Sequence, residues 1–330
     1  MPTTNTGGRQ ASPFMPKGST RDRIYVTAFL LGAGLLLYVG RGMLAQSTYA
    51  SLGLSFAGTT AAGILGIALY RVQIELRASR HELARKEAEL NFAREVQLAL
   101  FPREFPSGLG LDFNAVCVPA RGISGDYYDV MALPGGRLVF VFADISGKGI
   151  SAAILMSNVH AVLRILAAEG LPPGEVCSRL NRHLYQVTDA SRFATVFYGE
   201  WNAAARRLTY TNAGHNAPIL TGSRHGVRLE QGGPPLGLFL ESSYQEGSVT
   251  LESGDLIAVY SDGITDAENS DGEALGEFRL EGVIASHAEQ SLDEIQRQVL
   301  KALHEWSSEE ASDDATLLLA RVADSGKETR

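Results

Sequence analysis

The 330-residue sequence predicts an α+β protein, in which a layered sandwich of sheets and helices follows a transmembrane helical hairpin and a linker helix. Three observations support this prediction. Two long apolar runs without a charged residue lie near the N-terminus, and a stretch rich in Ala, Glu, Arg and Leu without Gly or Pro follows them. Beyond that stretch, β-rich runs occur in blocks separated by helical patterns, which favours a layered α+β arrangement over an alternating parallel one.

The composition limits the class of protein. With 45% hydrophobic and 20% charged residues, the chain is expected to hold one domain of roughly 200 to 250 residues with attached segments. The formal net charge of -8 argues against nucleic acid as a partner, because no basic stripe is available to neutralise phosphates. Cys117 and Cys177 have no metal-ligand spacing and indicate a reducing compartment.

The first 70 residues are predicted to form a tail and a membrane hairpin. Residues 1–20 are rich in Pro, Gly, Ser and Thr and are expected to be disordered. Residues 21–70 form the hairpin, with spans at about 24–40 and 49–70, each close to the ~20 residues that cross a bilayer. Basic residues flank both ends of the hairpin, whereas Arg41 is the single basic residue between the spans. Both termini are therefore expected on the cytoplasmic side of the cytoplasmic membrane.

Two other interpretations of this region remain open. A basic start, an apolar core and the sequence Ala45-Gln46-Ser47 also imitate a cleaved signal peptide. A buried hairpin of a soluble protein is the other alternative, although no charge interrupts either apolar run.

Residues 71–102 are predicted to form the linker helix, which ends at the proline that closes this range. Leu76, Leu83 and Leu90 recur every seven residues, with Gln97 next in the repeat. This spacing indicates a possible short coiled coil and a homodimer, and a solvated connector is the alternative. If dimerisation controls the domain, monomeric and forced-dimer forms differ in activity, and equal activity would contradict such control.

Residues 103–322 form the predicted globular domain, and residues 323–330 a tail. The predicted strands are 112–118, 127–133, 137–143, 194–201, 207–212, 248–251, 255–260 and 315–321. The predicted helices are 152–168, 175–187 and 292–306.

Aspartates stand at the ends of the predicted strands. Asp144 and Asp262 each follow an apolar run and precede a glycine-containing turn, while Asp126 and Asp313 each precede such a run. An aspartate in such a place is also a common turn residue or helix cap, so each is a weak signal by itself. Gathering four carboxylates would cost several kcal/mol by repulsion unless cations lie between them. All-oxygen ligands favour Mg²⁺ or Mn²⁺, and two such ions suit phosphate-ester hydrolysis.

Neighbouring residues are candidates for supporting roles. Asp129 and Asp266 are expected to act as hydrogen-bond partners of the ligands or as helix caps, and Asp314 adjoins Asp313. His215 follows a predicted strand, where it either stabilises a loop or contacts phosphate, and His160 is expected in the core.

Two common motifs are missing. The segment Gly147-Lys148-Gly149 is not a P-loop, because no Gly stands five residues before Gly147 and Gly149 replaces the required Ser or Thr. No Gly-x-Ser-x-Gly sequence, which would indicate a serine hydrolase, occurs.

Ordered motifs run from residue 93 to residue 321. They are Ala93-Arg94-Glu95-Val96-Gln97, Leu100-Phe101-Pro102, Pro119-Ala120, Gly125-Asp126-Tyr127-Tyr128-Asp129-Val130, Asp144-Ile145-Ser146-Gly147-Lys148-Gly149, Ala152-Ala153, Met156, Ala213-Gly214-His215-Asn216, Pro235-Leu236-Gly237, Gly254-Asp255, Ser261-Asp262-Gly263 and Asp313-Asp314-Ala315-Thr316. Together they resemble the SpoIIE-type branch of the bacterial PPM (type 2C) metal-dependent serine/threonine phosphatases. The resemblance implies a four-layer αββα sandwich, the PPM phosphatase fold.

The resemblance also implies a two-metal site that holds Mn²⁺ or Mg²⁺. Asp126 and Asp144 would be ligands, with Asp144 bridging both ions and the carbonyl of Ile145 contributing, while Asp262 and Asp313 would hold the second ion. The segment that usually reads Gly-Gly-Asp is Ser124-Gly125-Asp126 here.

One position departs from eukaryotic relatives, which carry a His two residues after the bridging Asp. Ser146 stands there in this sequence, so the general acid is not identified.

The implied function is a membrane-anchored protein serine/threonine phosphatase in a partner-switching pathway, whose phosphorylated substrate protein is an anti-sigma-factor antagonist. The segment 267–278 is expected to be either a flap that shapes the substrate surface or a plain surface loop. A catalytically silent membrane scaffold and a phosphatase of small phosphate esters are the alternatives.

Alkaline extraction tests the predicted hairpin. Spanning helices stay in the lipid when peripheral proteins are stripped from it, so we expect the full chain to remain with the pelleted membranes. A chain that starts at residue 71 is the control and is expected in the supernatant. Release of the full chain into the supernatant would contradict the hairpin.

Overall fold

The computed structural model describes residues 32–35, 38–40, 48–120, 122–189, 191–307 and 313–323. Contacts divide the chain into two units, Met1–Ala84 and Arg85–Arg330. The predicted N-terminal tail and most of the predicted first span lie outside the described residues, and within that span residues 32–35 and 38–40 are helical.

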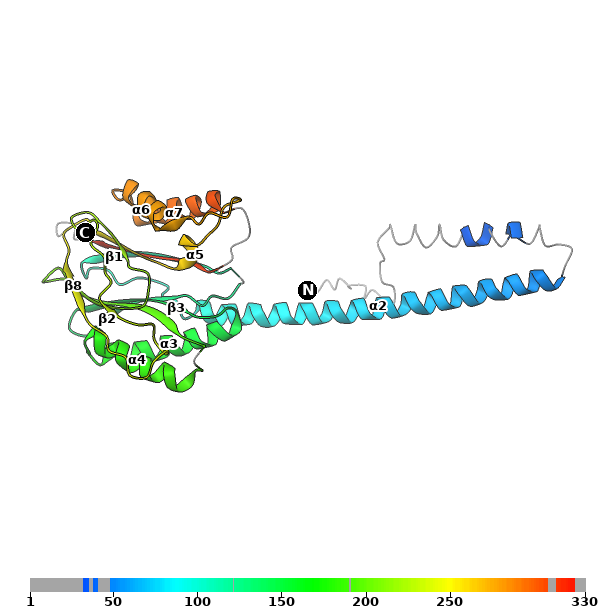
Figure 1. Cartoon of the computed structure of the whole chain (residues 1–330), viewed down its shortest axis with the longest axis horizontal. Helices are drawn as coiled ribbons and strands as arrows, with labels where there is room; N and C mark the ends of the chain where they lie inside the picture. Colours follow the sequence, from blue (N-terminus) through cyan, green and yellow to red (C-terminus); the bar gives the residue numbers. More distant parts are fainter. Residues whose placement is uncertain are drawn as a thin grey trace, which may run out of the picture. The chain divides into compact units, whose positions relative to one another are not determined.

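Helix α2 covers Thr48–Leu98, so the predicted second span and the predicted linker are one continuous helix (Figure 1). The linker was predicted to reach residue 102, and this end is wrong by four residues. Pro102 lacks an N–H and restricts the residue before it, and the helix accordingly ends before that pair.

The heptad positions of α2 divide into two environments. Leu76, Leu83 and Leu90 are exposed, whereas Gln97 is buried. The Gln97 amide donates to the Ser124 carbonyl at 2.6 Å, and the Ser124 N–H donates back to Gln97 Oε1 at 2.9 Å. Gln97 is therefore committed to the globular unit, and the coiled coil of the three leucines stays a prediction.

Two helices in the described ranges are long and apolar enough to cross a membrane, by length and composition alone. They are Ser55–Leu98, which lies within α2, and Ile150–Ala168. The second is α3, whose apolar side packs in the core of the globular unit, so the first is the candidate membrane helix.

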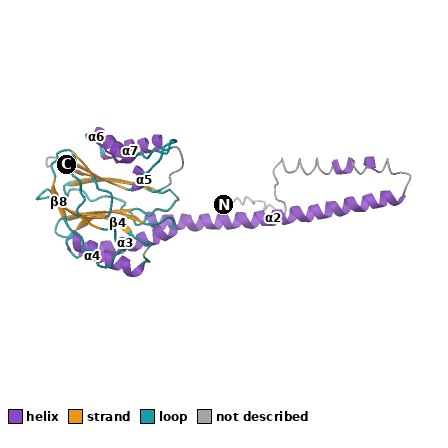
Figure 2. Cartoon of the chain, viewed as in Figure 1, coloured by secondary structure: helices purple, strands orange, loops and turns teal. Residues whose placement is uncertain are grey.

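Two sheets form the centre of the globular unit (Figure 2). One has the order β1-β10-β9-β6, and the other has the order β2-β3-β4-β5-β7, with β8 also paired to β5. The strands are β1 (Leu111–Val118), β2 (Tyr127–Leu133), β3 (Arg137–Ile145), β4 (Ala194–Asn202), β5 (Arg207–Ala213), β6 (Ile219–Thr221), β7 (Gly232–Gly233), β8 (Gly247–Thr250), β9 (Leu256–Tyr260) and β10 (Ala315–Val322). All neighbouring strands are antiparallel except the short parallel pair of β5 and β7.

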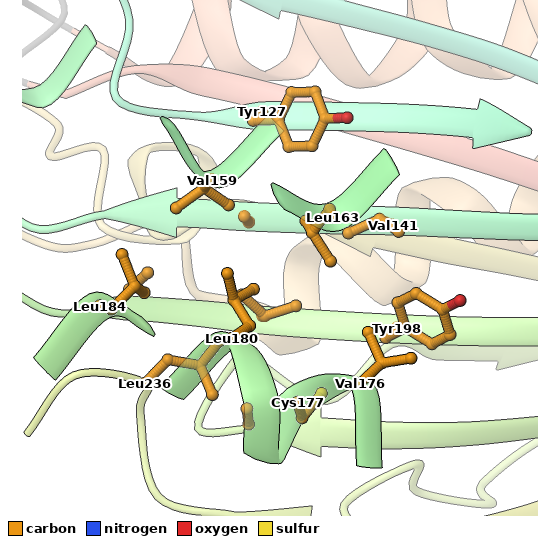
Figure 3. Close-up of a cluster of buried hydrophobic side chains, with 14 of the residues drawn as sticks. Tyr127, Val141, Val159, Leu163, Val176, Cys177, Leu180, Leu184, Tyr198 and Leu236 are labelled. Atoms are coloured by element: carbon orange, nitrogen blue, oxygen red, sulfur yellow. The ribbon is translucent and has the colours of Figure 1, made fainter. Parts of the chain in front are cut away.

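Helices cover the outer face of each sheet, which gives four layers (Figure 1). Helices α3 and α4 (Pro173–Val187) pack on the β2–β5 sheet through the apolar cluster drawn in Figure 3. Helices α6 (Gly276–Ser286) and α7 (Leu292–Trp306) pack on the other sheet, and a third cluster fills the gap between the sheets. The predicted αββα sandwich is therefore confirmed.

The period of two along each strand decides where the polar residues lie. In β3, Val139 and Val141 face the helices, whereas Phe140 and Phe142 face the opposite sheet. Asp144 continues the second set, so its position directs it into the gap between the sheets at the end of the strand.

Several short elements were not predicted. They are β6, β7, α6 and the single turn α5 (Asp262–Thr265). Most are too short to show a hydrophobic period in the sequence. Helix α6 starts at Gly276, inside a glycine-rich and acidic segment that resembles a loop in sequence.

Candidate metal centre

Five aspartates from different parts of the chain gather at one end of the gap between the sheets. Asp126 precedes β2, Asp144 is the penultimate residue of β3, Asp262 begins α5 two residues after the end of β9, and Asp313 and Asp314 precede β10. The charges of Asp262, Asp313 and Asp314 all raise the pKa of Asp144, and the charge of Asp144 raises that of Asp126. The structure thus brings together all four predicted ligands.

Asp126 is the most deeply buried of these carboxyl groups. Burial, followed by the charge of Asp144, raises its pKa well above the ordinary value. The hydroxyls of Thr316 and Ser261 are near enough to lower that pKa, yet Oδ2 of Asp126 is buried and has no hydrogen bond of ordinary geometry. A buried carboxylate oxygen without a partner costs free energy, which a bound cation would offset.

Asp144 lies at the boundary between the buried gap and solvent. Burial raises its pKa to about 7, and the neighbouring aspartates add to the shift. The next residue, Ile145, directs its carbonyl toward Gly125, where an added Cβ atom would lie 2.9 Å from that oxygen. A glycine is needed here so that the segment before Asp126 can approach the carbonyl.

Asp314 holds two loops of the site in place. Its carboxylate accepts hydrogen bonds from the N–H groups of Ala120, at 2.9 Å, and Gly125, at 2.7 Å. Its carbonyl accepts from the Ser261 hydroxyl at 2.8 Å, and a Cβ atom at Gly263 would lie 2.2 Å from the same carbonyl. The segments that carry Asp126 and Asp262 are therefore both tied to the start of β10.

The part of the site formed by Asp262 and Asp313 also contains the positively charged side chain of Lys148. The ammonium of Lys148 forms a 2.8 Å ion pair with Oδ2 of Asp313. Burial, Asp313 and Asp266 raise the pKa of Asp262, while the Gly263 N–H and Lys148 lower it. In the sequence, Lys148 belongs to the Asp144–Gly149 motif and to a segment that fails as a P-loop, and neither pattern predicts this contact.

Within the described ranges, no three Asp, Glu, His or Cys side chains already surround one point in a way that could hold a metal ion. The donors themselves suit a hard divalent cation, because they are carboxylates and a backbone carbonyl, and one buried oxygen lacks a partner. The chemistry of the donor set therefore fits Mg²⁺ or Mn²⁺, while closing a coordination shell requires side-chain movement, including at the Lys148–Asp313 pair.

The side chain of Asp129 is bonded to residues other than these carboxylates. It is on the face of β2 that meets α3, where Arg164 contacts it at 2.7 and 3.0 Å and the Tyr127 hydroxyl donates to it at 2.8 Å. Tyr127 also lies 3.1 Å from Nδ1 of the half-buried His160. This group joins α3 to the sheet.

The other two supporting candidates lie beside the site. The N–H of Asp266 donates to the Asp262 carbonyl at 2.7 Å, and its charge raises the pKa of Asp262. The His215 ring contacts Phe142 in a tilted arrangement with ring centroids 4.9 Å apart, and its Nδ1 lies 2.9 Å from the Thr195 hydroxyl. Burial lowers the pKa of His215 to about 4, so the ring is neutral at neutral pH.

The four-layer sandwich with an acidic site at the ends of its central strands defines a PP2C-type phosphatase domain. Among solved structures, the SiaA-PP2C domain of Pseudomonas aeruginosa has a TM-score of 0.66 at 20% identity and aligns with 72% of this chain and 98% of its own. The RsbU and RsbW domains of Rv1364c from Mycobacterium tuberculosis have a TM-score of 0.57 at 29% identity, covering 65% of this chain and 60% of theirs. RsbX, crystallised in complex with magnesium, has a TM-score of 0.50 at 17% identity, covering 67% of this chain and 99% of its own.

Sequence comparison identifies the family. The family model for Stage II sporulation protein E (SpoIIE) matches residues 134–323. The phosphoserine phosphatase RsbU of Bacillus subtilis is 32% identical over 76% of this chain and 74% of RsbU. The phosphoserine phosphatase RsbP of the same organism is 27% identical over 61% of this chain, but over only 49% of RsbP. The chain belongs to the SpoIIE family, as its motifs predicted.

The raised carboxyl pKa values predict how stability depends on pH in the presence of a chelator. A carboxyl group whose pKa is raised by folding binds its proton more tightly in the folded state, so stability is lost as pH rises toward the folded pKa. For Asp144 this window runs from its ordinary value of 3.8 to about 7, and Asp126 acts in the same direction. The lowered pKa values of His160 and His215 act oppositely, but only below their ordinary value of 6.5.

We therefore expect the thermal midpoint of the chelated protein to fall between pH ~6.5 and ~8. The expected loss is roughly 1 kcal/mol, or about 2–4 °C. Asp144→Asn, which cannot ionise, should show a smaller fall in differential scanning fluorimetry. A midpoint that rises over this range, or an equal fall in both proteins, would contradict the carboxylate repulsion.

Proposed function

We propose that the globular unit is a metal-dependent phosphatase that hydrolyses phosphoserine or phosphothreonine in a protein. The observation that supports this proposal most strongly is the buried, unpaired oxygen of Asp126 among four further aspartates. The membership of the SpoIIE family, with two relatives named phosphoserine phosphatases, supports the reaction class.

The chain's own residues would divide the binding of two divalent cations, Mn²⁺ or Mg²⁺. Asp126, Asp144 and the Ile145 carbonyl would hold one ion, Asp262 and Asp313 the other, and Asp144 would contribute to both. Such ions supply a water nucleophile at neutral pH and neutralise charge on phosphoryl oxygens. Asp314 and Asp266 would keep the loops of Asp126 and Asp262 in place through the contacts described above.

Protonation of the leaving group is assigned neither to His215 nor to Ser146, which stands where eukaryotic relatives carry a His. His215 is neutral at neutral pH because burial lowers its pKa to about 4. Ser146 stabilises the loop, since its N–H donates to the Phe193 carbonyl at 2.9 Å and its hydroxyl accepts from the Phe193 N–H at 2.8 Å. Water is the proposed proton donor.

The segment 267–278 offers a surface for a protein substrate. Within this segment, residues 269–273 form a tight turn, because Asn269 Oδ1 accepts hydrogen bonds from the N–H groups of Asp271 and Glu273, each at 2.9 Å. The Trp306 indole donates to the Glu273 carbonyl at 3.0 Å, which ties the turn to α7. Phe278 at its end is 87% exposed. We propose that this turn contacts the substrate, a phosphorylated anti-sigma-factor antagonist of a partner-switching pathway.

Anchoring of this phosphatase in the cytoplasmic membrane is also a proposal, with two spans and both termini cytoplasmic. It is supported by the apolar, exposed N-terminal half of α2 and by the charge pattern around the two apolar runs. The alkaline extraction described above tests it.

Removing a metal-site carboxylate tests the proposed reaction. We expect Asp144→Asn and Asp262→Asn to lower Mn²⁺-dependent hydrolysis of a phosphoserine peptide by more than about 100-fold, because each removes a charged oxygen ligand. Asp112→Asn is the matched control, since Asp112 is exposed at the far end of β1 and should retain full activity.

A chelator should abolish the wild-type activity, and excess Mn²⁺ should restore it. A small phosphate ester assayed in parallel separates a protein phosphatase from a phosphatase of small metabolites. Unchanged turnover in folded Asp144→Asn and Asp262→Asn variants would contradict the ligand assignment, and no turnover by the wild type would favour a silent scaffold.

A further inference from the structure

Lys148 stands in the loop that leads from β3 to α3, four residues after Asp144. Its ammonium lies 2.8 Å from Oδ2 of Asp313, and the side chains of the two residues are 42% and 41% exposed. The charge of Lys148 also lowers the pKa of Asp262. One ammonium therefore acts on both carboxylates of the same half of the site.

The backbone conformation of the loop fixes the position from which the Lys148 side chain extends. Gly147 and Gly149, on either side of Lys148, have φ angles of 100° and 73°, which favour glycine. Ser146 is joined to Phe193 by hydrogen bonds in both directions. The reach of Lys148 toward Asp313 thus depends on a constrained turn and a flexible four-carbon side chain.

The two halves of the site differ in charge. The largest influences on the pKa of Asp126 and of Asp144 are burial, other carboxylates and hydroxyl groups, and none of them is a cation. The Asp262–Asp313 half, by contrast, has Lys148. A cation entering the second half meets a positive charge already paired with Asp313, whereas no cation is among the main influences on the two carboxylates of the first half.

We propose that Lys148 is a built-in counter-ion that competes with the divalent cation at Asp262 and Asp313. This inference rests on the two-metal centre of the proposed function. A divalent ion at these carboxylates must displace the ammonium from Asp313 and then tolerate its charge at a distance of a few ångströms. Lys148 thereby makes the second ion bind more weakly than the first, and the two ions load in order.

Removing the charge while keeping the length of the side chain tests this competition. The repulsion between a single and a double positive charge about 5 Å apart in water corresponds to roughly tenfold in affinity. We expect Lys148→Met to tighten the weaker of two Mn²⁺ sites about tenfold and to leave the tighter site unchanged. Lys148→Arg, which keeps the charge, should resemble the wild type.

The measurement is a Mn²⁺ titration of the full-length protein in detergent, with free Mn²⁺ followed by electron paramagnetic resonance, so that it does not depend on activity. Lys301→Met is the matched control, because Lys301 pairs with Glu305 at 3.8 Å on the exposed side of α7. Circular dichroism confirms that each variant is folded, and Lys148→Gln serves as a second neutral variant.

The possible outcomes separate this inference from the proposed function. Unchanged affinities in Lys148→Met and Lys148→Gln, or equal tightening in Lys301→Met, would overturn the competition while leaving the metal centre intact. Weaker binding in the neutral variants would show that Lys148 assists the metal and would also overturn it. No Mn²⁺ binding in any variant would overturn both proposals.

Discussion

Repulsion among five aspartates at one end of the central gap is the constraint on which the rest of the site depends. Burial and mutual charge raise the pKa values of Asp126, Asp144 and Asp262 together. The packed interior of the sandwich maintains this unfavourable gathering, because Phe140, Phe142 and their neighbours fill the gap behind it. The fold thus supplies the free energy that holds these negative charges together, at the place where we propose that cations bind.

The site is held together by backbone contacts more than by contacts between the acidic side chains. The Asp314 carboxylate accepts a hydrogen bond from the Gly125 N–H. The Ser261 hydroxyl donates to the Asp314 carbonyl and accepts from the Thr316 N–H. Gly263 has no side chain, which allows the Asp314 backbone to approach it closely. The buried Gln97 joins the end of α2 to Ser124, two residues before Asp126. A long helix therefore ends in direct contact with the segment that presents one of the proposed ligands.

The four layers and the four principal aspartates were predictable because each signal is local. Apolar runs of strand length that end in Asp144 or lead to Asp262 can be read directly, and ordered motifs gave the family. The position of Asp129 was not predictable from proximity to Asp126, since it depends on which face of β2 meets Arg164 on α3. The ion pair of Lys148 with Asp313 was missed because 165 positions separate them in the sequence and only the fold brings them together. The continuity of α2 was missed because an apolar span and a charged linker differ in composition but share helical propensity.

In the proposed function, the gathered carboxylates form a centre for two divalent cations, divided between an Asp126–Asp144 half and an Asp262–Asp313 half. Anomalous scattering at the manganese edge, from crystals of the protein grown with excess Mn²⁺, would locate these ions. We expect two peaks, one in contact with Asp126, Asp144 and the Ile145 carbonyl, and one in contact with Asp262 and Asp313. No peak at this end of the gap, or ions bound only by other residues, would contradict this proposal.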